Sequence, residues 1–325
     1  MKEFYHNRRV LVTGAGGFIG SALVDRLVDL GAEVTAGVSS LNRTWRLDGV
    51  ANRVRIISAD LSEPEDAQRM IEAVRPLIIF NLASSVRTER VFAHAGDIIR
   101  NTYTVTESLI NASVRVGVEK FVQFGSIEEY GSGAAPFNET QREEPISPYS
   151  FAKVAATQYA LLAHHLSSTR TCVIRPAATF GPRQGTGMLI PSAIMAGIEG
   201  KEFGMNAGEQ MRDFIYIEDL VDGVLRVGME PAADGQIINL GSGSGHLIKD
   251  IVTNINTEMG NQIHLNFGVQ SYRLHDPMVF FMDTSKAQRL LGWRAIYSIS
   301  QGIEKTVSWY RSNYLTIQKY YEEKK

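Results

Sequence analysis

Short apolar runs alternate with amphipathic segments through the first third of the chain. The apolar runs are predicted to form strands at Arg9–Thr13, Glu33–Val38, Val54–Ser58, Leu77–Leu82 and Lys120–Phe124. The segments between them have apolar residues at helical spacing, at Phe18–Leu30, Glu65–Val74 and Asp97–Val116. Apolar strands separated by such helices are typical of a parallel sheet that is covered on both faces. The pattern therefore predicts an α/β fold with a doubly wound parallel sheet.

Composition and charge exclude several classes of protein. The chain has 325 residues, 44% of them hydrophobic, which is enough to bury a large core. A formal net charge of −2 gives no bulk basicity, so neither nucleic acid nor an anionic membrane is an expected partner. No apolar stretch is long enough to span a membrane and no signal peptide is visible, so we expect a cytoplasmic protein. Cys172, as the sole cysteine, cannot form an internal disulfide, and the histidines lack metal-ligand spacing, so we expect no metal site.

A glycine-rich turn joins the first predicted strand to the first predicted helix, and it contains Gly14, Gly17 and Gly20. Glycines at this spacing permit a tight turn and let backbone N–H groups approach a pyrophosphate. They also let the helix pack closely against the strand. The N-terminus of the helix adds positive potential. The motif indicates a Rossmann-like dinucleotide-binding domain.

Two later segments depart from the regular alternation. Residues 178–206 are rich in Gly, Pro and Met, and residues 245–294 are mixed in composition. We expect them to build a smaller, discontinuous substrate-binding lobe at the carboxyl edge of the sheet. The last stretch, Trp309–Lys325, is predicted to be a surface helix with a frayed end. The predicted domains are a dinucleotide-binding domain at 1–177, with 212–244 returning to it, and a substrate-binding lobe at 178–211 and 245–325.

The residues after the second predicted strand bear on which dinucleotide binds. NAD sites usually place Asp or Glu here to accept hydrogen bonds from the ribose hydroxyls. In this chain Ser39 follows the strand, so no carboxylate would repel a 2′-phosphate, and Arg43 and Arg46 are available to bind one. We therefore expect NADP, with NAD as the alternative. Asp60, after the third strand, is a candidate partner for the adenine edge.

Tyr149 and Lys153 are candidates for proton-transfer chemistry. A spacing of four places both side chains on one face of a helix. A nearby ammonium favours the tyrosinate, so Tyr149 can exchange a proton with a sugar hydroxyl or carbonyl near neutral pH. Ser126 follows the strand that ends at Phe124 and is placed to hydrogen-bond the same oxygen.

These residues occur together with further motifs along nearly the whole chain. The motifs are, in order, Gly14-x-x-Gly17-x-x-Gly20, Asn81-Leu-Ala-Ser, Ser126, Tyr149-x-x-x-Lys153, Arg212-Asp-Phe-Ile-Tyr-Ile-Glu-Asp219 and Asp283-Thr-Ser-Lys-Ala-Gln-Arg-Leu-Leu-Gly-Trp293. In this order they resemble the extended short-chain dehydrogenase/reductases of the nucleotide-sugar epimerase/dehydratase family. The resemblance implies an enzyme that exchanges a hydride between a nicotinamide and a carbon of a nucleotide-diphosphate sugar, usually C4. It also implies a homodimer built through the helices at Thr102–Val116 and Val154–Leu166.

The same resemblance implies roles for individual residues. Tyr149 would be the acid/base, Lys153 would bind the nicotinamide ribose and lower the tyrosine pKa, and Ser126 would orient the substrate oxygen. Asn101 would help to hold the lysine through water. Further contacts with the cofactor are expected from Phe18, Ile19, Leu61, Leu82 and Ala83.

On the substrate side, Arg212 and Arg273 fall where members of the family grip the diphosphate, and two arginines suit two phosphates. The alternative is that both are surface ion pairs, Arg212 with Asp213 or Arg273 with Asp276. The chain departs from the family pattern at Ala178, where many members have an asparagine that contacts the substrate.

The segment Gly125-Ser-Ile-Glu-Glu-Tyr-Gly131 discriminates best among the reactions of the family. Simple 4-epimerases have small neutral residues after the serine, whereas this chain has Glu128 and Glu129, of which we expect at least one to be a solvated loop charge. Sugar 4,6-dehydratases place a C5 proton acceptor at the position of Glu128, but usually after Asp or Ser rather than Ile127. The whole string is most similar to 4-keto-6-deoxy-sugar reductases. We therefore expect a reductase first, then a dehydratase and then an epimerase, and we disfavour a non-enzymatic NADP-binding protein.

Overall fold

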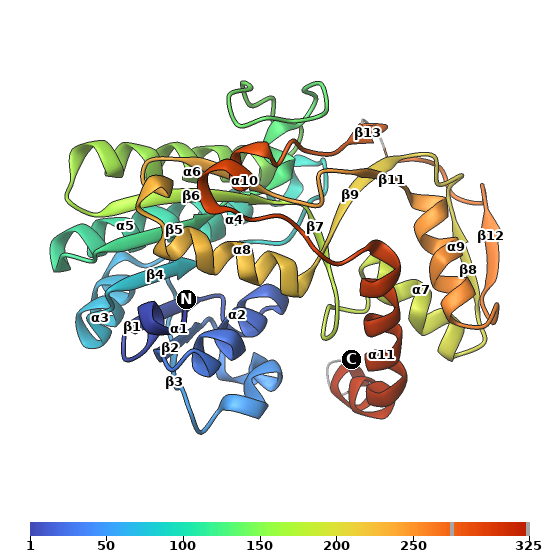
Figure 1. Cartoon of the computed structure of the whole chain (residues 1–325), viewed down its shortest axis with the longest axis horizontal. Helices are drawn as coiled ribbons and strands as arrows, with labels where there is room; N and C mark the ends of the chain where they lie inside the picture. The colour runs from blue at the N-terminus through green and yellow to red at the C-terminus, as the bar shows by residue number, and fades with distance from the viewer. Residues whose placement is uncertain (274–275, 323–325) are drawn as a thin grey trace.

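A seven-stranded parallel sheet forms the centre of the molecule, with the strand order β10-β6-β5-β4-β1-β2-β3 (Figure 1). The computed structural model describes residues 1–273 and 276–322, and the side chains of Arg43, Tyr321 and Glu322 lie outside the described part. The strands of this sheet are β1 (Arg9–Thr13), β2 (Glu33–Val38), β3 (Arg55–Ser58), β4 (Ile78–Asn81), β5 (Lys120–Phe124), β6 (Arg170–Pro176) and β10 (Ile237–Leu240). Each neighbouring pair is parallel, so the predicted fold class is confirmed.

Helices cover both faces of the sheet. They are α1 (Lys2–Tyr5), α2 (Phe18–Asp29), α3 (Pro64–Val74), α4 (Ala95–Ile99), α5 (Val105–Val116), α6 (Pro148–Leu166), α8 (Ile217–Met229) and α10 (Ser285–Leu291). Successive side chains of a strand point to opposite faces. Val10 and Val12 of β1 therefore belong to the core shared with Leu23 of α2, whereas Leu11 belongs to the core shared with Met70 of α3 and Leu109 of α5. This burial on both sides explains why the strands are continuously apolar.

A smaller lobe lies beside the main sheet, at the right of Figure 1. Its strands form one sheet in which β9 is flanked by β11 and β13 and also pairs with β7, and a second sheet of β8 and β12. These elements are β7 (Ala178–Phe180), α7 (Leu189–Ile198), β8 (Glu202–Met205), β9 (Met211–Tyr216), β11 (Gly245–Leu247), α9 (Ile248–Glu258), β12 (His264–Phe267), β13 (Val279–Phe280) and α11 (Ile299–Glu322). Residues 212–244 contribute to both parts, because β9 joins the small sheet whereas β10 joins the large one. The division into domains at the expected boundaries stays a prediction.

The C-terminal helix is longer than the helix expected over Trp309–Lys325, and the end at which fraying is expected lies outside the described residues. It begins at Ile299, ten residues before Trp309, and it buries Ile303, Val307 and Tyr310. The Tyr310 hydroxyl donates a hydrogen bond to the carbonyl of Gln184. The pattern of buried residues shows that α11 is packed against the small lobe.

The helix predicted over residues 97–116 is also interrupted. A π-helical turn at Arg100–Thr104 separates α4 from α5. The carbonyl of Asn101 accepts a hydrogen bond from the Ser85 N–H at 3.1 Å, so a neighbouring segment uses an acceptor of this turn. Single π-turns inside helices are frequent at functional sites.

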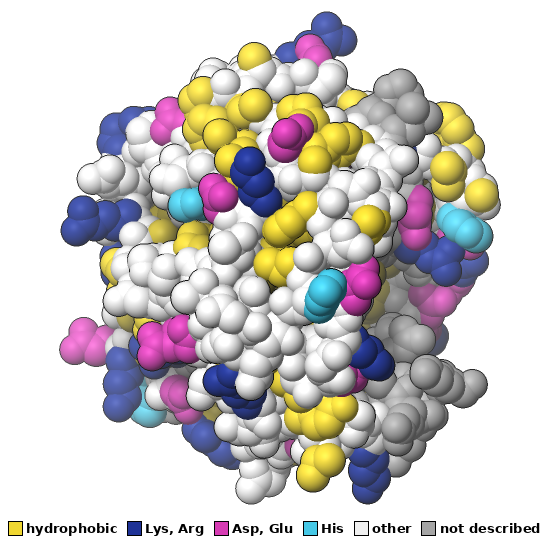
Figure 2. All heavy atoms as spheres, turned by 90° about the vertical axis from the view of Figure 1, so that its right-hand side faces the viewer, with side chains coloured by type: hydrophobic (Ala, Val, Ile, Leu, Met, Phe, Trp, Pro, Cys, Tyr) yellow, Lys and Arg dark blue, Asp and Glu magenta, His cyan; other side chains and the backbone are white. Residues whose placement is uncertain are grey.

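The face of the small lobe is shown in Figure 2, where hydrophobic side chains gather in the upper part and charged side chains lie mainly around the edges. Within the described residues no helix combines the length and the apolar character needed to cross a bilayer. Cys172 is buried in β6, as its apolar neighbours predict.

Candidate active site

The glycine turn after β1 has the close contacts that its sequence predicts. Gly14 has φ +66°, and a Cβ at this position would lie 2.8 Å from the carbonyl carbon and oxygen of Leu82 and 2.9 Å from the nitrogen of Ala83. A Cβ on Gly20 would overlap the carbonyl oxygen of Gly14. The helix α2 begins after Gly17, which provides no side-chain cap, so the N–H groups of its first turn remain available to an anion. This cradle fits the pyrophosphate of a dinucleotide.

The residues around the end of β2 agree only in part with the expected binding of an NADP 2′-phosphate. Ser39 is exposed, as a ribose or phosphate contact requires, and the side chain of Arg43 lies outside the described part. Arg46 is engaged elsewhere: its Nε donates to the carbonyl of Arg183 at 2.8 Å and its Nη1 to the carbonyl of Gly16 at 3.2 Å. Its guanidinium therefore connects the glycine turn to the small lobe through hydrogen bonds.

The other expected cofactor contacts lie along the carboxyl edge of the sheet or next to it. Asp60 is exposed and accepts hydrogen bonds from the N–H and hydroxyl of Ser62, which lower the pKa of its carboxyl. Phe18 and Ile19 form the first turn of α2, Leu61 is buried after β3, and Leu82 and Ala83 face Gly14. Their contacts with a cofactor stay predictions.

Ser126, Tyr149 and Lys153 come together at the end of β5. Ser126 follows the strand, and Tyr149 and Lys153 lie on α6, whose first turn is capped by Ser147. The Ser126 side chain is close enough to the Tyr149 phenol to lower its pKa. The buried Lys153 Nζ donates to the carbonyl of Phe124 at 2.8 Å and lies 5.8 Å from the centre of the Tyr149 ring. The structure therefore brings together the three residues that the sequence singles out.

Burial is the main influence on the proton affinities of this cluster. It raises the pKa of Tyr149 above its ordinary value, and the Ser126 side chain offsets only part of that effect. Burial also lowers the pKa of Lys153 to about 8, against the opposing attraction of the Glu129 carboxylate. At neutral pH the phenol therefore keeps its proton in the protein alone, and the proton exchange expected of Tyr149 stays a prediction.

A cavity of about 420 Å³ is lined by Glu128, whose N–H donates to the Ser126 hydroxyl. The other lining residues include Arg90, Arg212, Arg273 and Asp276, together with residues of the small lobe. Asp276 Oδ1 pairs with Arg212 Nη2 at 2.9 Å and with Arg90 Nη2 at 3.2 Å. A single carboxylate therefore orients two arginines toward a cavity that also contains Arg273. Such an arrangement can bind a diphosphate through charge-assisted hydrogen bonds.

The ion pairs differ from those that the sequence suggested as alternatives. Arg212 pairs with Asp276, whereas the carboxylate of Asp213 accepts hydrogen bonds from the N–H and hydroxyl of Ser242. Sequence reasoning missed Arg90, which lies in an extended segment with no periodic pattern and is distant from Asp276 in the chain.

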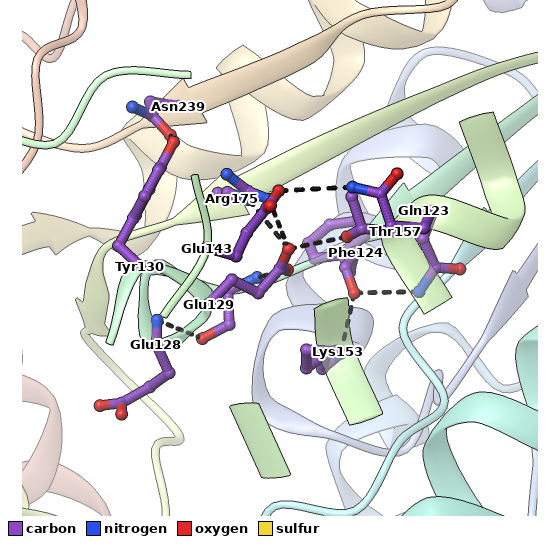
Figure 3. Close-up of polar contacts among 12 residues, drawn as sticks. Gln123, Phe124, Glu128, Glu129, Tyr130, Glu143, Lys153, Thr157, Arg175 and Asn239 are labelled. Carbon is purple, nitrogen blue, oxygen red and sulfur yellow. Dashed lines mark hydrogen bonds and ion pairs between the residues drawn. The ribbon is translucent and has the colours of Figure 1, made fainter. Parts of the chain in front are cut away.

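The two glutamates after Ile127 occupy different environments, and neither is a solvated loop charge. Glu128 is half-buried and lines the cavity, and burial raises the pKa of its carboxyl while Arg90 and Arg212 lower it. Figure 3 shows the Glu128 carboxylate directed away from the contacts around Glu129. Glu129 is completely buried and pairs with Arg175. The expectation that at least one is solvated is therefore wrong, because the tight turn directs one inward and the other into the cavity.

The Asn101 side chain donates from Nδ2 to the carbonyl of Asp97 at 2.8 Å, so its water-mediated role toward Lys153 stays a prediction. Ala178 begins β7. Among the described residues, no group of three His, Cys, Asp or Glu side chains could hold a metal ion.

Comparisons with known proteins agree with this geometry. The model of the NAD dependent epimerase/dehydratase family matches residues 10–241. The UDP-glucose 4-epimerase of Mycolicibacterium smegmatis is 32% identical over 318 residues, which cover 94% of this chain and 99% of that protein. The dTDP-D-glucose 4,6-dehydratase of Mus musculus is 27% identical and covers 94% and 90% of the two chains. The structure of UDP-glucuronic acid 4-epimerase from Bacillus cereus, in complex with UDP-glucuronic acid and NAD, has a TM-score of 0.85, 25% identity and coverage of 93% and 99%.

Proposed function

Because the chain belongs to the NAD-dependent epimerase/dehydratase family of nucleotide-sugar enzymes, we propose that it transfers a hydride at C4 of a sugar carried on a nucleoside diphosphate. One observation carries the proposal. The glycine turn and Ser126 follow β1 and β5, whose carboxyl ends lie at the same edge of the parallel sheet, and Glu128, whose N–H donates to the Ser126 hydroxyl at 3.1 Å, lines the cavity with Arg90, Arg212 and Arg273. A proton-transfer group thus lies between a dinucleotide cradle and a diphosphate-binding surface.

In this proposal a bound nicotinamide dinucleotide supplies or accepts the hydride. Tyr149 moves the proton to or from the oxygen on C4, and Ser126 hydrogen-bonds that oxygen. Lys153 provides positive charge beside the phenol and binds the nicotinamide ribose. Arg212 and Arg273 bind the diphosphate, and this holds the sugar against Tyr149.

For the net reaction we propose NADPH-dependent reduction of an NDP-4-keto-6-deoxyhexose. The protonated Tyr149 phenol supports this direction, because reduction needs a proton donor at the oxygen on C4. Ile127 packs into the hydrophobic core at the position where dehydratases have a polar residue, so it cannot donate a proton to a departing hydroxyl. Ser39, in place of a carboxylate after β2, supports NADP over NAD.

Two other reactions have specific support. Glu128 lines the cavity and would serve as the C5 proton acceptor of a 4,6-dehydratase. The relative at 32% identity is a UDP-glucose 4-epimerase, and the similar epimerase structure contains NAD, which favours an NAD-dependent 4-epimerase.

A turnover assay with two arms tests these possibilities. In the first arm the protein receives NADPH or NADH with a panel of 4-keto-6-deoxy nucleotide sugars, and absorbance of the reduced nicotinamide is followed. In the second it receives nucleotide hexoses without added reduced cofactor, and product mass and isomer are measured. We expect the reduced nicotinamide to be oxidised in the first arm, and we expect NADPH to be oxidised faster than NADH. Turnover only in the second arm would contradict the reductase, with loss of water indicating a dehydratase and an isomer of unchanged mass an epimerase.

Glu128→Gln separates the roles of this carboxylate. In a reductase we expect kcat/KM to fall by about tenfold or less, because one charged hydrogen bond to the sugar is weakened. Exchange of the C5 proton with solvent deuterium, followed by mass spectrometry, gives the second readout. A loss of about 10²- to 10⁴-fold together with loss of exchange would instead assign Glu128 as a general base. Glu144→Gln, which alters an exposed carboxylate bonded to Ser132, is the control.

We also propose that the protein is a homodimer that pairs through α5 and α6. These helices pack side by side and leave Leu162 and Leu166 of α6 50% and 76% exposed, and Phe151 near the start of α6 is also exposed. Light scattering is expected to give twice the chain mass of 36.0 kDa, and Leu162→Glu is expected to give the monomer mass. Leu315→Glu, at another exposed leucine, on α11, should not change the mass. A wild-type mass of one chain would contradict the dimer. The cytoplasmic location stays a proposal.

A further inference from the structure

Glu129 and Arg175 form a fully buried ion pair beneath the candidate active site (Figure 3). Glu129 Oε2 accepts from Arg175 Nε at 2.9 Å and lies 2.8 Å from Arg175 Nη2. The same Nη2 donates to Glu143 Oε1 at 2.6 Å, and the guanidinium lies 4.5 Å from the centre of the Tyr130 ring. Burying two charges is costly unless the geometry is good, so the pair is weak evidence for a role in stability alone.

The other contacts of Glu129 lead directly to the candidate catalytic residues. Its Oε1 accepts from the backbone N–H of Ser126 at 2.8 Å, and its Oε2 accepts from the Thr157 hydroxyl at 2.9 Å. Thr157 lies on α6 four residues after Lys153 and eight after Tyr149, so the three share one helix face. Glu129 therefore connects the Ser126 turn to the face of α6 that carries the other two residues.

The sequence around Ser126 is adapted to this connection. A Cβ on Gly125 would overlap Glu129 Oε1 and would lie 3.3 Å from Arg175 Cγ. Only a glycine leaves room for the carboxylate to fold back beneath the turn. The string Gly-Ser-Ile-Glu-Glu thus contains both the buried carboxylate and the space that it occupies.

We propose that Glu129 is a positioning residue of the site, whose carboxylate holds Ser126 against the α6 face with Tyr149 and Lys153 and places a negative charge beside both. The inference rests on the proposed function, in which these three residues act on the oxygen on C4. Arg175 pairs with this carboxylate from β6, and Glu143 accepts a hydrogen bond from the Nη2 atom that contacts Glu129.

The charge of Glu129 has a measurable consequence. The charged and titratable groups facing Lys153 and Tyr149 are Glu128 and Glu129 from the turn after β5, while on α6 the two residues face each other. Glu129 raises the pKa of Lys153 and also that of Tyr149. Removing its charge should lower both. If kcat/KM depends on the ionisation of either group, the corresponding transition in its pH profile therefore moves to lower pH in Glu129→Gln. This holds whether the phenol gives or takes the proton.

The experiment compares wild type with three variants. Glu129→Gln removes the charge, Thr157→Val removes the link to α6 without changing charge, and Glu143→Gln removes the other carboxylate on Arg175. Each is followed by its pH profile of kcat/KM and by the ¹³Cε shift of Lys153 during a pH titration, with Lys153→Met assigning the signal. We expect Lys153 in wild type to titrate near pH 8 and in Glu129→Gln about one pH unit lower.

Thr157→Val is expected to lower kcat without moving the titration, and Glu143→Gln is expected to leave the titration in place. An unchanged titration in Glu129→Gln, or an equal shift in all three variants, would overturn the proposal. If Glu129→Gln does not fold, the triple variant Glu129→Gln/Arg175→Gln/Glu143→Gln replaces the whole buried charge cluster and should show the same downward shift. A wild type that turns over no sugar would refute the proposed function, while the Lys153 titration would still test the effect of Glu129.

Discussion

Tyr149→Phe is expected to lower turnover by about 10²- to 10⁴-fold while leaving the affinity for the dinucleotide within about twofold of wild type. The substitution removes the phenolic proton beside Ser126, and it keeps the ring beside Lys153. Because the glycine turn binds the pyrophosphate in our proposal, the loss should appear in kcat and not in cofactor binding.

Stopped-flow turnover with the 4-keto sugars and a fluorescence titration with NADPH measure the two quantities separately. Tyr159→Phe is the matched control, since it removes a phenol on the same helix that donates to Asn111 at 2.7 Å. It should retain nearly full turnover. Retained activity in Tyr149→Phe would exclude this residue as the proton donor, whatever the net reaction.

Much of the large sheet could be predicted from the chain because local and tertiary preferences agree there. The strands are apolar on both sides, so β1, β2 and β5 begin and end at the predicted residues. The same reasoning fails at Arg100–Thr104, where a hydrogen bond from Ser85 to Asn101, outside the helical pattern, accompanies the π-turn. The polar composition of the last segment also does not indicate that α11 begins at Ile299 or that one of its faces is buried. That face is buried because the helix packs against the small lobe.

The candidate site divides in the same way. Gly14, Ser126, Tyr149 and Lys153 could be predicted because each lies at the end of a strand or on the helix after it, and parallel strands bring these ends together. The arrangement of the charged residues around them could not be predicted. Arg90 and Arg212 both pair with Asp276, which is distant in the chain from both, and no spacing rule connects such residues.

The position of Glu129 could not be predicted from the sequence either. Beside Glu128, it has the sequence context of a surface loop, yet the 3₁₀ turn at Ile127–Tyr130 directs it into the protein toward Arg175 of β6. Two adjacent carboxylates therefore lie in different environments, since Glu128 lines the cavity and Glu129 pairs with the buried Arg175. Only the tertiary pairing distinguishes them.

Gly14→Ala is expected to weaken dinucleotide binding by more than about tenfold and to lower the stability of the fold. A residue with a Cβ at φ +66° costs about 1–2 kcal/mol. The Cβ would also press on the backbone of Leu82 and Ala83 at 2.8–2.9 Å, and such overpacking typically costs about 1–3 kcal/mol. Relief of these contacts requires the turn to move away from β4, which displaces the N–H groups that would face the pyrophosphate.

Fluorescence titration with NADPH and NADH measures the loss of affinity. The midpoint temperature of thermal unfolding without ligand is expected to fall by roughly 5–10 °C. Gly49→Ala is the control, because no atom lies within 4 Å of its added Cβ. The control should bind both dinucleotides normally, since a methyl group in open space changes neither the turn nor its N–H groups. Normal binding by Gly14→Ala would mean that the cofactor does not depend on the close approach of this turn to β4, and the assignment of the cradle would then be wrong.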